Sequence, residues 1–418
     1  MKQYVIKGGN KLSGTINIDG SKNAALALIP ASLLCKDRVT LTNVPNISDI
    51  IDMLEILKEL NVKYEFKNNT LDIDASEIIN RPLISEKIKN IRASYYFMGA
   101  LLSLFKHVEI VAPGGCKIGN RPIDYHLNSF KKMGVNILQN KDIYELSYSY
   151  LNNTTLTLPF PSVGATINLM LASVLSENII VIDNISCEPE VLQVMEYLKL
   201  SGAKIKLIDN HTLIIIGVTK LKKINFKVMN DRIEAGTYCI LGALLGDHLT
   251  IKGINKEHIL SLLTILDHIN VNYSLIDESI TFYQSNFKNY IYVETSPYPL
   301  FPTDLQQPLC VLASFLPHDS IIYEKIYYER KGHIQELKKM GANIFTFQNK
   351  IVIKGNGKLH GANLIASDLR GGAALVIAAL TATGNSQLSN IHYIERGYPD
   401  LINKLNKVGA NIKMEDII

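Results

Sequence analysis

A glycine-rich stretch between Pro113 and Pro122 carries the residues best suited to chemistry. It reads PGGCKIGNRP, so Cys116 stands one residue before a lysine and five before an arginine. A cationic neighbourhood favours the thiolate, which is the reactive form of cysteine. Three glycines in seven residues also let the backbone approach a ligand closely. A surface turn with an incidental cysteine explains this stretch alone equally well, because isolated cysteines are mostly inert core residues.

Basic residues stand at the expected starts of three apolar helices, at Lys22, Arg92 and Arg370. A helix N-terminus already carries partial positive charge, so a cation there opposes the helix dipole. We therefore expect something negative beside each of them, and we interpret it as an anionic ligand. Simple capping explains the polar residues at three other helix starts, which are Ser162, Thr303 and Asp368.

The elements that must position these residues repeat six times along the chain. Each repeat has a glycine or asparagine between a helical pattern and a strand, at Asn61, Gly134, Gly202, Asn270, Gly341 and Gly409. Successive spacings are 73, 68, 68, 71 and 68 residues. Glycine and asparagine are typical of helix C-caps, where φ is positive. We expect six copies of one β/α unit, arranged as three plus three; a solenoid is the rival arrangement.

Composition narrows the class of protein. A chain of 418 residues exceeds one ordinary core, so two domains are expected. The net charge of +4 gives no case for a nucleic-acid partner, and the five scattered cysteines favour neither a disulfide framework nor a metal site. No apolar run reaches the roughly 18 residues of a membrane span, and no signal peptide is evident. We expect a cytoplasmic protein that binds neither nucleic acid nor a membrane.

Eight motifs resemble the UDP-N-acetylglucosamine 1-carboxyvinyltransferase family. They are GSKNAA from Gly20, RAS from Arg92, PGGC from Pro113, VGAT from Val163, DRIEAGTY from Asp231, PYPLFPTD from Pro297, DLRGG from Asp368 and ERGY from Glu395. The resemblance implies an α/β fold of two inverse α/β barrel domains, each of three βαβαββ units. One domain would span 22–229 and the other 1–21 plus 230–418, with the active site in the cleft between them.

The resemblance also implies an activity. The enolpyruvyl group of phosphoenolpyruvate would pass to the 3′-hydroxyl of UDP-N-acetylglucosamine by addition and elimination, releasing phosphate. This is the first committed step of peptidoglycan synthesis and the target of fosfomycin. No metal or organic cofactor is implied, and we expect a monomer acting on small molecules.

The family's functional positions carry over residue by residue. Cys116 would be the general acid and Asp304 would occupy the base position, with Lys22 at the reacting centre. The phosphoenolpyruvate site is expected to comprise Lys22, Asn23, Arg121, Arg370 and Arg396. The UDP-N-acetylglucosamine site is expected to comprise Asn23, Arg92, Arg121, Pro122, Ile123, Asp124, Tyr125, Ser162, Val163, Gly164, Asp304 and Ile326. Arg330 matches a further family arginine near the cleft.

Several positions depart from the family pattern and leave nucleotide affinity and fine positioning open: Ser48, Phe160, Ile167, Glu329 and Lys331. Two alternatives remain. An enolpyruvyl transferase like 5-enolpyruvylshikimate-3-phosphate (EPSP) synthase would share fold and donor, but lacks the Gly-Gly-Cys loop. A catalytically silent paralogue would bind the UDP-sugar as a regulator. The histidines near the motifs, His126, His333 and His392, are expected to pack or face solvent rather than to catalyse.

Overall fold

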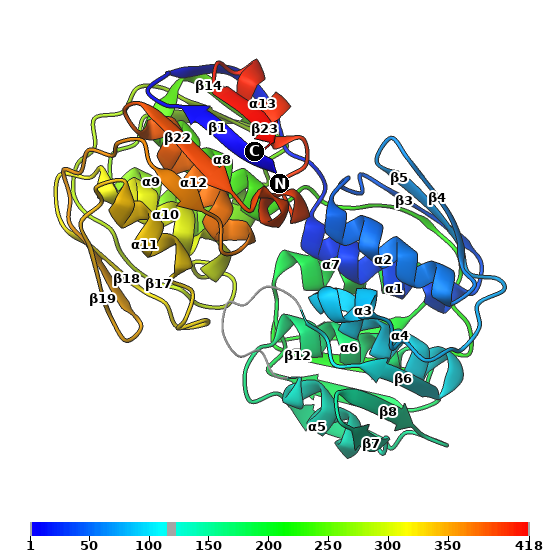
Figure 1. The fold of residues 1–418 in the computed structure, drawn as a ribbon. Coiled ribbons are helices and arrows are strands. Elements are labelled where there is room, and N and C mark those ends of the chain that lie inside the picture. The colour runs from blue at the N-terminus through cyan, green and yellow to red at the C-terminus, as the bar shows by residue number, and fades with distance from the viewer. Residues whose placement is uncertain (1, 115–122, 417–418) are drawn as a thin grey trace. The chain divides into compact units, whose positions relative to one another are not determined.

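The computed structural model describes residues 2–114 and 123–416, which form two compact units (Figure 1). We call residues 2–19 with 230–416 the Asp304 unit, and residues 20–114 with 123–229 the Arg92 unit. Three predicted site residues lie outside the described residues: Cys116, Arg121 and Pro122.

The Asp304 unit contains three four-stranded sheets. Its strands are β1 (Lys2–Lys7), β2 (Leu12–Asn17), β14 (Gly246–Lys252), β15 (Tyr273–Ile276), β16 (Ser279–Phe282), β17 (Tyr292–Glu294), β18 (Ser320–Tyr323), β19 (Ile344–Phe347), β20 (Lys350–Ile353), β21 (Asn363–Ile365), β22 (Asn385–Ser389) and β23 (Asn411–Asp416). The strand orders are β15-β16-β14-β2, β17-β18-β20-β19 and β21-β22-β1-β23. Strand β1 therefore pairs with two strands from the opposite end of the chain.

Three buried helices fill the interior of the Asp304 unit. They are α8 (Arg232–Leu245), α10 (Gln306–Ser314) and α12 (Leu369–Thr381). Almost every residue of these helices is buried, because they are apolar on all sides. The outer helices α9 (Leu260–His268), α11 (Gly332–Lys339) and α13 (Leu401–Lys407) bury one face only. Three short 3₁₀ helices complete the unit: η3 (Lys256–Ile259), η4 (Thr303–Leu305) and η5 (Ile391–Arg396).

The Arg92 unit repeats this plan. Its strands are β3 (Arg38–Thr42), β4 (Lys63–Lys67), β5 (Thr70–Asp74), β6 (His107–Val111), β7 (Asn136–Asn140), β8 (Ile143–Ser147), β9 (Thr154–Thr157), β10 (Ile179–Asp183), β11 (Lys204–Ile208), β12 (Thr212–Ile216) and β13 (Asn225–Lys227). They form sheets in the orders β13-β3-β5-β4, β6-β8-β7 and β11-β12-β10-β9. Leu83 adds a single parallel bridge to β6, at the place where the other sheets have a fourth strand.

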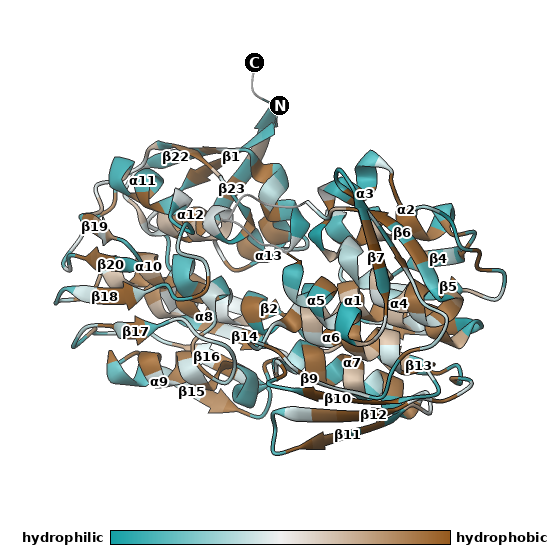
Figure 2. Ribbon diagram, turned by 90° about the horizontal axis from the view of Figure 1, so that it is seen from below, coloured by the Kyte–Doolittle hydropathy of each residue, from teal (hydrophilic) through white to brown (hydrophobic). Residues whose placement is uncertain are grey.

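The helices of the Arg92 unit divide in the same way. The buried ones are α1 (Lys22–Ser32), α4 (Tyr96–Phe105) and α6 (Val163–Ser173). The outer ones are α2 (Ser48–Glu59), α5 (Asp124–Lys132) and α7 (Pro189–Leu200). Short helices η1 (Leu33–Cys35), η2 (Arg92–Tyr95) and α3 (Glu86–Asn90) link them. Figure 2 shows polar, teal residues along α3 and α11, and long apolar, brown stretches in β10 and β12.

The six predicted helix ends all have positive φ, at Asn61 (59°), Gly134 (96°), Gly202 (102°), Asn270 (61°), Gly341 (95°) and Gly409 (101°). A strand starts within three residues of each one. The prediction of six β/α units in two groups of three is therefore confirmed, and the solenoid is excluded. The Asp304 unit and the Arg92 unit, each built from three of these repeats, are both inverse α/β barrels, with apolar helices inside and sheets outside.

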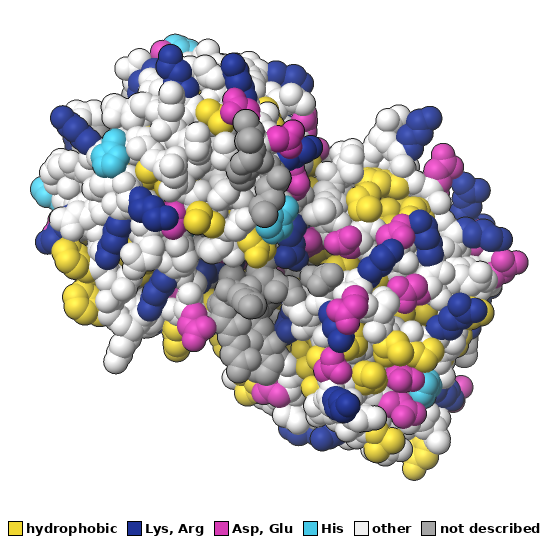
Figure 3. Space-filling model, in the orientation of Figure 1, with side chains coloured by type: hydrophobic (Ala, Val, Ile, Leu, Met, Phe, Trp, Pro, Cys, Tyr) yellow, Lys and Arg dark blue, Asp and Glu magenta, His cyan; other side chains and the backbone are white. Residues whose placement is uncertain are grey.

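Charged side chains are dispersed over the surface. On the face shown in Figure 3, Lys and Arg are interspersed with Asp and Glu rather than gathered into one basic patch. Within the described ranges, no helix combines the length and the apolar character that crossing a bilayer requires.

Candidate active site

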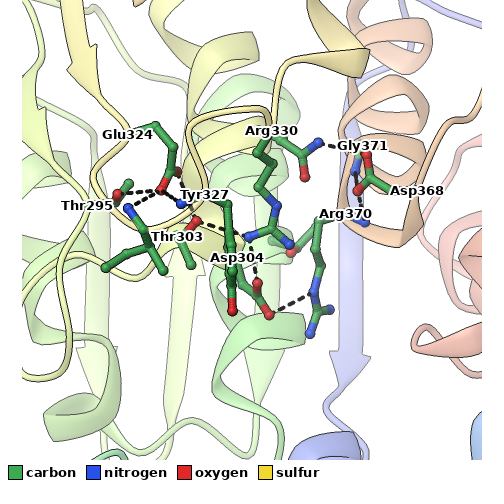
Figure 4. A network of polar contacts seen from close by, with 12 residues as sticks. Thr295, Thr303, Asp304, Glu324, Tyr327, Arg330, Asp368, Arg370 and Gly371 are labelled. Atoms are coloured by element: carbon green, nitrogen blue, oxygen red, sulfur yellow. Dashed lines mark hydrogen bonds and ion pairs between the residues drawn. The ribbon is translucent and has the colours of Figure 1, made fainter. Parts of the chain in front are cut away.

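Asp304 is the centre of the polar network in the Asp304 unit (Figure 4). It lies in η4, immediately before α10, and its Oδ1 accepts a hydrogen bond from Arg330 Nη1 at 2.7 Å. Its Oδ2 accepts from Arg370 Nε at 3.4 Å. The side chains of Arg330 and Arg370 are 5% and 2% exposed, whereas that of Asp304 keeps 26% of its surface. Two buried cations therefore hold one carboxylate that solvent still reaches.

The arginines keep Asp304 ionised. Burial raises the pKa of its carboxyl, but the charges of Arg330 and Arg370 outweigh burial and hold the pKa well below its usual range. A carboxylate with so low a pKa is a weak base, because general bases work best when their pKa lies near the operating pH. It remains a good acceptor for a substrate hydroxyl. The sequence shows that Asp304 lies at the start of a helix, but it does not show that two guanidinium groups lower the pKa of its carboxyl.

Arg370 is positioned by the start of α12. Asp368 caps this helix, because its Oδ1 accepts from the backbone N–H groups of Arg370 at 3.1 Å and Gly371 at 2.9 Å. The capping prediction for Asp368 is confirmed. The guanidinium of Arg370 lies 5.3 Å from the ring centre of Tyr398. Burial lowers the pKa of Arg370, but Tyr398 and Asp304 raise it beyond its usual range, so the guanidinium stays protonated.

The capping prediction for Thr303 is wrong. Pro302 is the residue before η4, and no side chain caps that helix. The Thr303 hydroxyl instead donates to Glu324 Oε2 at 2.8 Å and accepts from Arg330 Nη1 at 3.0 Å. Capping is a local property, whereas these partners come from the segment that follows β18. Two other predicted residues of this unit, Ile326 and Arg396, are half-buried, the latter at the end of η5.

Lys22 already has an anionic partner within the Arg92 unit. It is the first residue of α1, after Ser21, whose Oγ accepts from Ala24 N at 3.3 Å. Lys22 Nζ lies 2.7 Å from Asp49 Oδ2, and the two side chains are only 11% and 5% exposed. The negative charge expected beside Lys22 is a carboxylate of the chain itself, as Asp304 is for Arg370. Each of these two cations therefore has an anionic partner within the chain, and the anionic ligand expected beside them stays a prediction.

Arg92 lies over an aromatic pair in the Arg92 unit. Its Nη1 donates to Pro113 O at 3.3 Å, and its guanidinium carbon lies 5.5 Å from the ring centre of Tyr95. The Tyr95 ring packs edge-on against His126, with ring centres 4.9 Å apart. This arrangement brings η2 against the first turn of α5. A guanidinium group beside aromatic rings is suited to a nucleotide ligand, because it can stack on a base and bind a phosphate.

Asn168 joins the elements around this pair. It lies in the middle of α6, fully buried, and its Nδ2 donates to Tyr95 O at 2.8 Å and to His126 Nδ1 at 2.9 Å. Its Oδ1 accepts from Gly99 N at 2.8 Å. Burial and the nearby Arg92 lower the pKa of His126 to about 3, so the imidazole is neutral. The expectation that His126 packs rather than catalyses agrees with this burial.

The start of α6 approaches the same pair closely. Ser162 caps the helix by accepting from Ala165 N at 3.3 Å, as predicted. A Cβ at Gly164 would lie 2.7 Å from Tyr95 Oη and 3.1 Å from His126 Cε1, so only glycine fits without movement. The other described residues predicted at the nucleotide sugar are Asn23 and Val163, both half-buried, Ile123, buried, and Asp124 and Tyr125 in the first turn of α5.

Two important residues were missed from the sequence, Glu324 and Asn168. Asn168 left a signal, because a lone amide within the apolar run of α6 must find buried partners. Glu324 also left a signal, because it is an acidic residue directly after the apolar strand β18. Among the family departures, Ile167 is fully buried in α6, so an apolar side chain suits that position here.

His333 is a second buried histidine and belongs to the Asp304 unit. It is fully buried, and its Nδ1 lies 3.4 Å from Gln307 Nε2, which also donates to Asp368 at 3.1 Å. Burial lowers the pKa of His333 to about 4, although Asp368 opposes this. His333 is thus a neutral packing residue, in line with the expectation from the sequence.

Comparison with known proteins decides the family. Residues 6–405 match the family model of EPSP synthase (3-phosphoshikimate 1-carboxyvinyltransferase). The chain belongs to this enolpyruvyl transferase family. Within the family, it is 41% identical to UDP-N-acetylglucosamine 1-carboxyvinyltransferase 1 of Staphylococcus haemolyticus, over the whole of both chains. It is 40% identical to UDP-N-acetylglucosamine 1-carboxyvinyltransferase 2 of Clostridium acetobutylicum, again over both full lengths.

Solved structures of other enolpyruvyl transferases share the fold. The enolpyruvyl transferase NikO from Streptomyces tendae superimposes with a TM-score of 0.91 at 23% identity, covering 99% of this chain and 98% of NikO. EPSP synthase from Acinetobacter baumannii gives a TM-score of 0.75 at 17% identity, covering 100% of both chains. At these identities the likeness is one of architecture, and it agrees with the two inverse α/β barrels.

Proposed function

We propose that the chain transfers the enolpyruvyl group of phosphoenolpyruvate to the 3′-hydroxyl of UDP-N-acetylglucosamine and releases phosphate. The observation that carries the proposal is the identity of about 40%, over full length, to enzymes named for this reaction. The chain also retains the cysteine of the Gly-Gly-Cys loop, which EPSP-synthase-like transferases lack. Both alternatives, an EPSP-synthase-like transferase and a silent UDP-sugar-binding paralogue, are disfavoured.

In the proposed addition step, Cys116 delivers a proton to the methylene carbon of phosphoenolpyruvate while the sugar oxygen bonds to the neighbouring carbon. The substrate hydroxyl donates to Asp304, whose low pKa makes it an acceptor that orients the hydroxyl. The carboxylate takes the proton only as the new C–O bond forms and the hydroxyl becomes acidic. In the proposed elimination, the Cys116 thiolate left by the addition takes a proton back from the new methyl group as the C–O bond to phosphate breaks, which releases phosphate and leaves the vinyl ether.

Cations bind the donor in this proposal. Arg370 and Arg396 face the carboxylate of phosphoenolpyruvate, and Lys22, Asn23 and Arg121 face its phosphate and the reacting centre. Planar guanidinium groups suit both anions. Because Lys22 is paired with Asp49 and Arg370 with Asp304, the substrate anion joins or replaces an existing partner at each cation. Desolvation of these cations is thus largely complete before the substrate arrives.

The acceptor is proposed to bind the Arg92 unit through its nucleotide. Arg92, Ile123, Asp124 and Tyr125 would contact the nucleotide sugar with Arg121 and Pro122. The start of α6, at Ser162, Val163 and Gly164, would offer backbone N–H groups to the diphosphate. Ile326 would line the sugar pocket, and placement of both substrates between the domains 22–229 and 1–21 plus 230–418 stays a prediction.

The proposed reaction would place the protein in peptidoglycan synthesis, with consequences for cell shape and division. A cytoplasmic location follows from soluble substrates, and fosfomycin would be an inhibitor. A monomer acting without metal or organic cofactor remains our expectation.

Acceptor choice tests the proposal. We expect purified protein to release phosphate from phosphoenolpyruvate when UDP-N-acetylglucosamine is present and not with shikimate 3-phosphate. Release with shikimate 3-phosphate alone would favour the EPSP-synthase-like reading. Tight binding of the UDP-sugar without phosphate release would favour the silent paralogue.

A further inference from the structure

We propose that Glu324 is a positioning residue that fixes Asp304 through Thr303 and Arg330. The inference deepens the proposed function and rests on it. Glu324 lies outside the predicted site, directly after β18, and none of its surface is exposed. A carboxylate buried this completely requires several donors, and the identity of those donors connects it to the site.

Among the described residues, Glu324 accepts four hydrogen bonds. Its Oε1 accepts from Thr295 Oγ1 at 2.8 Å and from the backbone N–H groups of Ile326 and Tyr327 at 2.9 Å each. Its Oε2 accepts from Thr303 Oγ1 at 2.8 Å. Figure 4 shows Glu324 between Thr295 and Thr303, with Thr303 beside Arg330 and Asp304.

The direction of each bond toward Asp304 is determined. Arg330 Nη1 carries hydrogen and no lone pair for a hydrogen bond, so the Thr303 oxygen accepts from it and the Thr303 hydroxyl proton points at Glu324 Oε2. The Thr303 oxygen accepts from Arg330 Nη1 at 3.0 Å, and the same nitrogen donates to Asp304 Oδ1 at 2.7 Å. Arg330 cannot lose a proton, so it donates to both. The chain of hydrogen bonds therefore runs from Glu324 through Thr303 and Arg330 to Asp304, and each hydrogen bond strengthens the next by polarising it.

Glu324 also fixes the turn that carries Ile326. The two backbone bonds to its Oε1 hold the segment 325–327, where Ile326 is the residue predicted to line the sugar pocket. One buried carboxylate therefore orients two predicted contacts of the acceptor sugar, one through a side-chain relay and one through the backbone.

A purely structural role is the competing explanation, and Thr295 separates the two. Thr295 donates to Glu324 at the same 2.8 Å distance as Thr303. Its oxygen accepts from Lys325 N at 2.9 Å, not from an arginine that holds Asp304. Thr295→Val and Thr303→Val thus remove equivalent hydrogen bonds from one carboxylate, and only the second breaks the relay.

Steady-state kinetics with both substrates tests the relay. Glu324→Gln keeps the size of the side chain, but its amide group replaces the acceptor of Thr303. We expect Glu324→Gln and Thr303→Val each to lower kcat/KM for UDP-N-acetylglucosamine roughly 10- to 100-fold, the range for one hydrogen bond to a charged group. Thr295→Val should stay close to wild type. The Glu324→Gln, Thr303→Val double variant should have a kcat/KM no lower than that of the less active single variant, because both substitutions break the same chain of hydrogen bonds.

Losses that multiply in the double variant, or an equal loss in Thr295→Val, would overturn the relay. Wild-type protein without turnover would instead overturn the proposed function. The relay is then judged by urea unfolding of Glu324→Gln, Asp304→Asn and their double variant. Non-additive free energies of unfolding support the relay, since Thr303 and Arg330 lie between the two carboxylates. Additive values would reject it.

Discussion

Replacing Asn168 by aspartate reverses the polarity of one buried group without changing its size. In the wild type, Asn168 Nδ2 donates to Tyr95 O at 2.8 Å and to His126 Nδ1 at 2.9 Å. In Asn168→Asp an oxygen takes the place of that nitrogen, facing a carbonyl oxygen and an imidazole lone pair. Two buried acceptors lose their donors and a buried charge is added.

The expected cost follows from these contacts. A buried polar group left unsatisfied costs about 1–3 kcal/mol, so two acceptors predict a loss of about 2–6 kcal/mol in the free energy of unfolding at pH 8. Protonation of His126 restores one bond as an imidazolium–carboxylate pair. The folded-state pKa of His126, about 3 in the wild type, then rises above its unfolded value of about 6.5. That stabilisation is present below pH 6.5 and is lost as pH rises, so the loss is smaller at pH 6 than at pH 8.

The same change should weaken the acceptor site. Asn168 connects η2, α4 and α5 to α6, and three of these elements, η2, α5 and α6, carry the predicted nucleotide-sugar residues Arg92, Tyr125 and Val163. We therefore expect the KM for UDP-N-acetylglucosamine to rise more than the KM for phosphoenolpyruvate.

Urea unfolding at pH 6 and pH 8, with steady-state kinetics, checks this prediction. Asn184→Asp is the matched control, because Asn184 Nδ2 donates to Leu158 O at 2.7 Å in the same unit without a histidine partner. The control should lose similar stability at both pH values. A loss below about 1 kcal/mol for Asn168→Asp at pH 8, or a loss independent of pH, would refute the reasoning.

Three further predictions concern other parts of the molecule. Gly164→Ala places a Cβ 2.7 Å from Tyr95 Oη, so overpacking should lower the free energy of unfolding by about 1–3 kcal/mol, and displacement of Tyr95 should raise the KM for UDP-N-acetylglucosamine; an unchanged KM would contradict it. His126 and His333 have folded-state pKa values of about 3 and about 4, so the unfolded chain binds more protons below pH 6.5, and each lowers the free energy of unfolding by about 2 kcal/mol between pH 8 and pH 5. In urea unfolding, His126→Asn should lose the contribution of His126, which is about half of the acid dependence that the two histidines cause together. An unchanged acid dependence would exclude His126 as a cause. Fosfomycin should alkylate Cys116, and Cys116→Asp should keep activity but lose this sensitivity; peptide mass mapping of the adduct to Cys239 or Cys310 would be contrary evidence.

Local chemistry explains which parts of the fold were predictable. The six helix ends were readable because a positive φ favours glycine and asparagine, as at Asn61 and Gly409. Buried helices were readable from apolar runs such as that of α12, and the cap at Asp368 from its place before that run. These features depend on residues close together in the chain.

Contacts between distant residues were not predictable in the same way. Arg330 and Arg370 lie 26 and 66 positions from Asp304, and no local pattern shows that two buried cations converge on one carboxylate. The pairing of Lys22 with Asp49 depends on how α1 packs beside α2. Thr303 was misread for the same reason, since its hydroxyl bonds to Glu324 rather than to its own helix.

The identity of the reaction product tests the central claim most directly. Purified protein should be incubated with phosphoenolpyruvate and UDP-N-acetylglucosamine, and the nucleotide fraction examined by mass spectrometry and NMR. We predict UDP-N-acetylglucosamine bearing one enolpyruvyl ether at the sugar 3′-oxygen, with one phosphate released for each product molecule. Unmodified UDP-N-acetylglucosamine after prolonged incubation, or an enolpyruvyl group at another oxygen, would contradict the account.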